Sequence, residues 1–187
     1  MPILGIVASS IQNAIANANS YESIASATPT SATSVTFSSI PSTYKSLQLR
    51  IIGRSTVAGN DIGLYLQPNA ATGSVYTLHE LYVDGTTVYS FGYGTGIYTS
   101  GPYFEVTGST AIADTFGVAV IDIIDYASTT KNKTMTFLSG TDRNGAGNLS
   151  LKSSLWTSTN AITSLKIDGG GSSFASGTTF ALYGIKG

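Results

Sequence analysis

The chain has no cysteine and a single histidine in 187 residues, and these two shortages exclude whole classes of site. Without cysteine, neither a disulfide bond nor a thiolate-bound metal can form, and the redox compartment cannot be inferred. A metal centre built on histidine needs several nitrogen or sulfur ligands, which His79 alone cannot supply. The sequence therefore predicts no metal and no other cofactor.

Charged residues are scarce as well. Lys, Arg, Asp and Glu make up 10% of the chain, against about 25% in ordinary soluble domains. The net charge is −1, and the basic residues are scattered, the first being Lys45. Nucleic-acid binding needs a clustered basic face, so we expect no nucleic-acid partner. A domain with so little charge tends to associate with itself, which favours a homo-oligomer.

Long apolar runs are missing, and no stretch reaches the roughly 18 apolar residues that cross a membrane. The nearest is an N-terminal arm, residues 1–20, which contains no charged residue. It lacks the basic start of a signal peptide, and Ser9 and Ser10 interrupt its apolar run, although residues 16–18 faintly resemble a cleavage site. A sandwich domain closes its core without such an extension, so we expect the arm to contact another subunit. Its predicted partner-binding residues are Ile3, Leu4, Ile6, Val7, Ile11 and Ile15.

Beyond the arm, residues 21–187 form one predicted domain in which apolar and polar residues alternate. Leu47, Leu49 and Ile51 are one example, and such a period of two places one face of a strand in a core and the other toward water or a neighbour. Turn residues separate the runs every 8–15 residues or so, as in antiparallel sandwiches. We therefore predict an all-β, antiparallel, jelly-roll-like β-sandwich with an N-terminal apolar arm. The expected strands are 21–27, 34–39, 46–54, 61–67, 74–83, 86–93, 103–107, 116–125, 133–139, 147–155, 163–168 and 178–185.

The sequence offers little for catalysis. A Ser-His-acid triad needs a histidine base, and His79 precedes Glu80 on a predicted strand, so that the two point to opposite faces. The closest carboxylate pair, Asp122 and Asp125, also points to opposite faces of an extended strand, and a glycosidase needs two converging carboxylates. We predict that the protein is not an enzyme and has no catalytic residue.

Residues 141–148 begin like a calcium loop, with Asp142, Asn144 and Gly145, but they lack its closing glutamate. Asn-Gly is the strongest short-range signal for a β-hairpin. We therefore predict a hairpin turn at Asn144–Gly145.

Aromatic residues gather between positions 82 and 104, together with Gly92, Gly94, Gly96 and Gly101. Tyrosines on glycine-rich loops suit sugar rings or protein interfaces, because they combine apolar area with a polar hydroxyl. The alternative is that many of them fill the sandwich core. The candidate receptor or partner surface consists of Tyr89, Phe91, Tyr93, Tyr98 and Tyr103.

Five stretches, residues 1–10, 21–25, 35–50, 116–126 and 179–186, together resemble small virion structural proteins of tailed bacteriophages, notably those of cyanobacterial and other aquatic phages. The resemblance covers nearly the whole chain, through packing and turn patterns rather than active-site motifs. It implies a component of the virion that contacts other capsid or tail proteins and has no catalytic residues. Head decoration and tail association both remain open.

Two functional hypotheses follow. The first is a non-enzymatic virion subunit, a capsid decoration or tail-associated β-sandwich anchored by its arm. The alternative is a carbohydrate- or receptor-binding module of a tail fibre or baseplate, with a host surface glycan as its partner. A glycan-degrading enzyme is a third class, and it would need the converging carboxylate pair that the sequence does not show.

Overall fold

The computed structural model describes residues 20–187, and the predicted contacts of the arm, from Ile3 to Ile15, lie outside them. The described residues contain twelve strands and no helix, and hence no helix able to span a membrane. The strands are β1 (Tyr21–Ala27), β2 (Ser34–Phe37), β3 (Ser46–Gly53), β4 (Asp61–Pro68), β5 (Tyr76–Asp84), β6 (Thr87–Tyr93), β7 (Tyr103–Thr107), β8 (Gly117–Ile124), β9 (Lys133–Asp142), β10 (Gly147–Trp156), β11 (Leu165–Asp168) and β12 (Thr179–Ile185).

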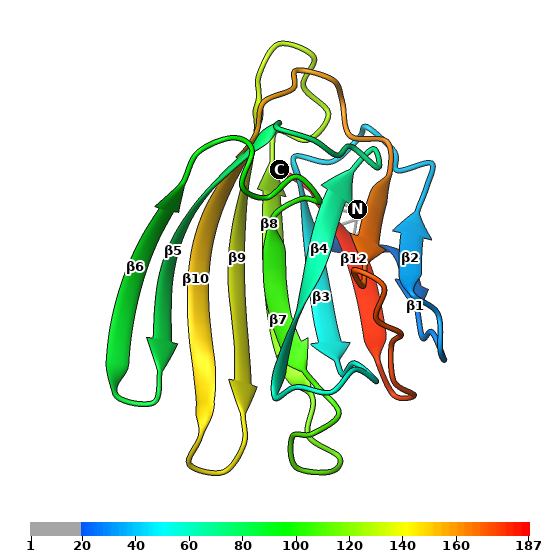
Figure 1. Ribbon diagram of the computed structural model, residues 1–187. Coiled ribbons are helices and arrows are strands. Elements are labelled where there is room, and N and C mark those ends of the chain that lie inside the picture. Colours follow the sequence, from blue (N-terminus) through cyan, green and yellow to red (C-terminus); the bar gives the residue numbers. More distant parts are fainter. Residues whose placement is uncertain (1–19) are drawn as a thin grey trace, which may run out of the picture.

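All strands pair antiparallel, in two sheets that pack face to face (Figure 1). The large sheet has the order β1-β12-β3-β8-β9-β10-β5-β6, and the small sheet has the order β2-β11-β4-β7. The chain crosses repeatedly from one sheet to the other, as in jelly-roll-like topologies. The predicted β-sandwich is confirmed.

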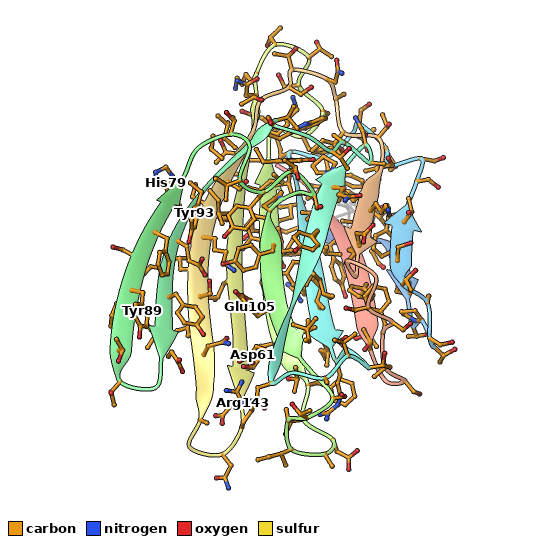
Figure 2. The ribbon with its side chains drawn as sticks, viewed as in Figure 1. Asp61, His79, Tyr89, Tyr93, Glu105 and Arg143 are labelled. Atoms are coloured by element: carbon orange, nitrogen blue, oxygen red, sulfur yellow. The ribbon has the colours of Figure 1, made fainter. Side chains whose placement is uncertain are left out.

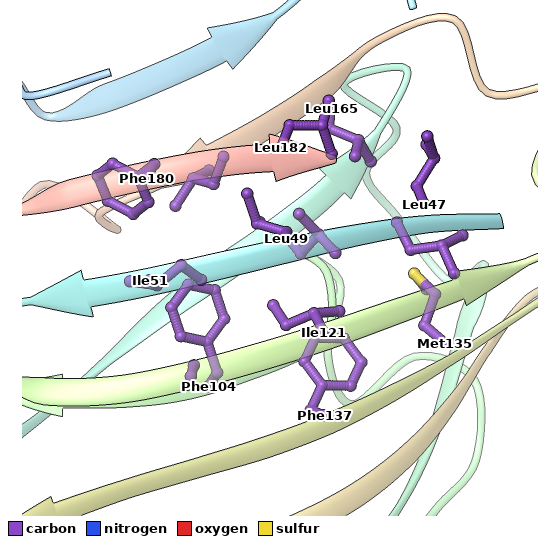
Figure 3. Close-up of a cluster of buried hydrophobic side chains, with 14 of the residues drawn as sticks. Leu47, Leu49, Ile51, Phe104, Ile121, Met135, Phe137, Leu165, Phe180 and Leu182 are labelled. Carbon is purple, nitrogen blue, oxygen red and sulfur yellow. The ribbon is translucent and has the colours of Figure 1, made fainter. Parts of the chain in front are cut away.

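The core lies between the sheets and follows the predicted alternation. Leu47, Leu49 and Ile51 of β3 are buried, and Phe104 of β7 faces the large sheet across the core. Figure 3 shows these side chains interleaved with Ile121 and others from the neighbouring strands. Close packing of branched and aromatic side chains at this interface supplies the main apolar burial of the fold.

The two sheets differ greatly in width, and this determines where functional surfaces can form. Edge strand β7 of the small sheet lies over β8 and β9 of the large sheet. The strands β10, β5 and β6 extend beyond it, to the left in Figure 1, with no small-sheet strand above them. The inner face of these three strands therefore has to be covered by its own side chains or by something bound to it.

On β10 the polar side chains are buried and the apolar ones are exposed. Leu149 and Leu151 are about half exposed on the outer face, whereas Lys152 and its serine neighbours Ser150 and Ser154 are buried on the inner face. On β8 the two faces are both apolar, and Val118 lies outside while Ile121 lies inside. The outer face of the large sheet is consequently rich in aliphatic side chains.

The hairpin between β9 and β10 has the predicted turn. Asn144 and Gly145 both have positive φ, 57° and 91°, and the Arg143 N–H donates to the Ala146 carbonyl. This pattern is typical of a type I′ turn and confirms the Asn-Gly hairpin prediction.

Candidate functional site

A cleft of about 380 Å³ opens on the overhanging part of the large sheet. Its walls are the inner face of β5 and β6 on one side and Tyr103 of β7 on the other. Figure 2 shows Tyr89 and Tyr93 along β6, with Glu105 and Asp61 on the side of the small sheet. The complete lining is Glu80, Tyr82, Asp84, Tyr89, Phe91, Tyr93 and Tyr103.

Three aromatic side chains of β6 form a row along this cleft. Tyr89, Phe91 and Tyr93 occupy alternate positions and so share one face of the strand. Their ring centroids are 6.1 and 5.9 Å apart, with interplanar angles of 11° and 20°. Tyr89 and Phe91 are 43% and 40% exposed, which is unusual for adjacent aromatic residues on a strand.

Two further tyrosines join this row to the small sheet. Tyr98, in the loop after β6, lies 5.0 Å from both Tyr93 and Tyr103, centroid to centroid. The structure thus brings together all five aromatic residues that the sequence singles out, at a distance from the core. Phe104, by contrast, is completely buried, so the core interpretation holds for that member of the cluster.

Next to the aromatic row, side chains of β5, β7 and β10 form a buried charge cluster that the sequence analysis did not identify. The Lys152 Nζ donates to Glu105 Oε1 at 2.7 Å and lies 3.3 Å from Glu80 Oε1. The same ammonium lies 3.5 Å from the centroid of the Tyr103 ring, in cation–π geometry. The sequence does not show that the two glutamates meet, because Glu80 lies on a strand of the large sheet and Glu105 on a strand of the small sheet.

Hydroxyl groups complete the coordination of both carboxylates. Tyr103 donates to Glu80 Oε2 at 2.6 Å and Ser150 donates to Glu80 Oε1 at 2.9 Å. Ser139 donates to Glu105 Oε2 at 2.7 Å. Every carboxylate oxygen of the pair therefore has a partner within the protein, so the cluster is suited to holding β7 against the large sheet.

The hydroxyls of Tyr98 and Tyr103, on the small-sheet side of the aromatic row, are held in the neutral form. Burial raises the pKa of Tyr103 well above its ordinary value, and its hydrogen bond to Glu80 raises it further. Burial likewise raises the pKa of Tyr98 to about 12. Both hydroxyls remain protonated at neutral pH and act as hydrogen-bond donors, not as bases.

Asn148 lies on the inner face of β10, two residues before Ser150, and is 8% exposed. It does not line this cleft. Burial raises the pKa of Tyr82, and a hydrogen bond with the Asn148 amide opposes that rise, so the two side chains are neighbours.

The residues first considered for catalysis do not converge. Asp122 lies on the outer face, where the Gln48 amide donates to it, and Asp125 follows β8 in a positive-φ conformation and pairs with Lys131. His79 is exposed on the outer face of β5, and Glu80 points to the opposite face as predicted. Residues 20–187 contain no group of three or more His, Asp or Glu side chains arranged to hold a metal.

The second unusual surface is the outer face of the large sheet. Register aligns two rows of side chains across β3, β8, β9, β10, β5 and β6. Leu138 and Leu151 at the centre are 49% and 52% exposed. A shallow hollow of about 660 Å³ lies over Gly140, between Val118 and Leu149. The aliphatic members of these two rows are Ile52, Leu81, Val83, Val88, Val118, Val120, Leu138, Leu149 and Leu151.

The two edges of the large sheet differ in protection. Edge strand β1 carries Glu22, paired with Lys186 at 2.6 Å, and its pairing with β12 shifts register between Ser23 and Ala25. Charges and bulges of this kind block strand addition. Edge strand β6 has neither a charged residue nor a proline and remains open to pairing.

The chain matches no protein-family model, and no curated protein and no solved structure shows significant similarity to it.

Proposed function

We propose that the protein is a non-enzymatic virion structural subunit of a tailed bacteriophage, which associates with copies of itself through the outer face of its large sheet. The observation that carries this proposal is the double row of exposed aliphatic side chains centred on Leu138 and Leu151. Exposed apolar patches of more than a few hundred Å² are rare on monomers and mark interaction sites. The resemblance to phage virion proteins supports the setting, a capsid or tail.

The surface chemistry favours a second copy of the same chain as the occupant of this face. The rows themselves carry no charged side chain except Arg50 at one end, so they offer nothing that would select a charged partner. The open edge of β6 continues this face through Val88, which allows one neighbour to pack on the aliphatic rows and pair with the edge. Closed homo-oligomers commonly use one patch of each subunit in this way.

The N-terminal arm is proposed to strengthen the same association. Its six aliphatic residues, from Ile3 to Ile15, have no charged neighbour and complement an apolar surface. The arm joins the domain at Ser20, beside Lys186 at the β1 edge. At about 3.3 Å per residue, the 19 preceding residues reach about 60 Å, which exceeds the width of eight strands spaced about 4.8 Å apart. The arm is therefore long enough to lie across the outer face of a neighbour.

Sedimentation velocity of the full chain tests the proposal. We expect the wild-type chain to sediment as an oligomer and the double variant Leu138→Lys, Leu151→Lys to sediment as a monomer with an unchanged circular dichroism spectrum. Thr134→Lys is the matched control, because Thr134 is exposed on the same face of β9 but lies outside the aliphatic rows. A wild-type monomer at micromolar concentration, or a double variant that keeps the wild-type oligomer, would overturn the proposed interface.

A further inference from the structure

The cleft between β6 and β7 has the composition of a ligand site. We propose that it binds a short, neutral oligosaccharide, whose rings lie against Tyr89, Phe91 and Tyr93 and whose hydroxyls reach the polar residues that line the same cleft, among them Tyr82 and Asp84. This role is separate from the self-association proposed for the outer face, because the aromatic row and the aliphatic rows lie on opposite faces of the same strands.

The first argument is the exposure of the aromatic row. A strand residue with an apolar side chain is stabilised by burial, yet Tyr89 and Phe91 leave about two-fifths of their surface open. No strand of the small sheet covers them, since that sheet ends at β7. The apolar faces of pyranose rings pack well against such aromatic surfaces, while the tyrosine hydroxyls offer polar contacts at the ring edges.

The second argument rests on the polar groups that line the cleft. Asp84 is exposed and accepts hydrogen bonds, and the hydroxyls of Tyr82, Tyr89 and Tyr93 both donate and accept them. Polar groups beside an apolar surface match a sugar, whose ring faces are apolar and whose edges carry hydroxyls.

The charges around the cleft favour a neutral ligand over an ionic one. The carboxylates of Glu80 and Glu105 are already paired with Lys152, which also occupies the face of Tyr103, so the place a cationic ligand would take is filled. An anion would meet the exposed Asp84 at the cleft wall. Arg143, in the hairpin between β9 and β10, is already paired with Asp61.

The buried charge cluster also holds the cleft in shape. Glu80 and Tyr103 line the cleft, and the contacts of the buried Lys152 with both residues fix the separation between β7 and β10. A rigid cleft loses little conformational freedom when a ligand binds. The cluster is accordingly a positioning device, and the contacts with the sugar belong to the aromatic row and to Tyr82 and Asp84 beside it.

The test uses the full chain and a glycan microarray, followed by saturation-transfer NMR with the neutral glycans retained on the array. Choline and sialyllactose serve as cationic and anionic probes. We expect neutral oligosaccharides to bind, and Phe91→Ala to weaken that binding by about tenfold or more. Val88→Ala is the matched control, because Val88 is exposed on the same strand but points to the outer face.

The melting temperature of Phe91→Ala separates a binding role from a structural one. Since the Phe91 side chain is 40% exposed, its removal should change the melting temperature little while it weakens glycan binding. The proposal is wrong if no neutral glycan is retained, if choline or sialyllactose binds in their place, or if Phe91→Ala and Val88→Ala bind equally well.

Discussion

The Lys152 ammonium lies 2.7 Å from the Glu105 carboxylate, and the lysine side chain has no exposed surface. Glu105 belongs to the edge strand of the small sheet and Lys152 to β10, the first strand of the overhang, so this contact joins the two sheets at the point where their overlap ends. The same lysine holds Glu80, which anchors the cluster to β5. One buried cation thus fixes the floor and one wall of the cleft.

Replacing this cation should destabilise the fold strongly. Lys152→Met leaves Glu80 and Glu105 buried without their counter-charge, and removing one member of a buried ion pair costs about 3–5 kcal/mol. Urea denaturation should show that loss in the free energy of unfolding. Lys131→Met, which breaks the exposed pair with Asp125, is the control and should cost less than about 1 kcal/mol. Equal effects of the two variants would contradict the role given to the cluster.

The positions of the strands follow from the sequence, whereas the choice of which face of a strand is buried does not always follow from it. All twelve predicted strands exist, because alternation and turn residues such as Asn144–Gly145 are local signals. On β10, hydrophobicity favours Leu149 and Leu151 as the buried side, but the structure buries Lys152. The sequence contains no local sign of this reversal, because the lysine is stabilised by two glutamates 47 and 72 residues away in the chain.

The aromatic cluster was predictable as a candidate surface, and its geometry was not. Its composition marks residues 82–104, but only the unequal width of the sheets leaves Tyr89 and Phe91 uncovered.

We predict no glycosidase activity, although Glu80 and Glu105 converge on one lysine. Every oxygen of the two carboxylates accepts a hydrogen bond or an ion pair within the protein, which leaves neither free to protonate a glycosidic oxygen or attack a sugar. Incubation with the polysaccharides that the cleft retains should release no reducing ends. Turnover that is lost in Glu105→Gln, with the fold intact, would show that the protein is an enzyme.

Alkaline pH should unfold the protein through its buried tyrosines. Burial raises the pKa of Tyr76 and Tyr103 far above the value of about 10 in an unfolded chain, and the pKa of Tyr98 to about 12. Because the folded-state pKa values are higher, stability is complete below pH 10 or so and is lost as the pH rises further. Absorbance titration of the native protein should therefore ionise only some of the 11 tyrosines near pH 10. Ionisation of all 11 near that pH, before the fold is lost, would contradict this.

Deleting residues 1–18 should remove assembly without removing the fold. The described domain closes its core within residues 20–187, so the truncated chain should keep its β-sheet circular dichroism spectrum and its cooperative melting. It should sediment as a smaller species than the full chain and fail to enter assembled particles. If the truncated chain enters particles at full occupancy, the arm has no anchoring role.

The most direct measurement of the central claim is electron cryomicroscopy, combined with mass spectrometry, of particles produced from the genome that encodes this chain. We predict that the chain is a stoichiometric component of the virion and that a neighbouring subunit covers Leu138 and Leu151 on the outer face of the large sheet. Absence of the chain from purified virions, or its presence with this face open to solvent in every copy, would contradict the account.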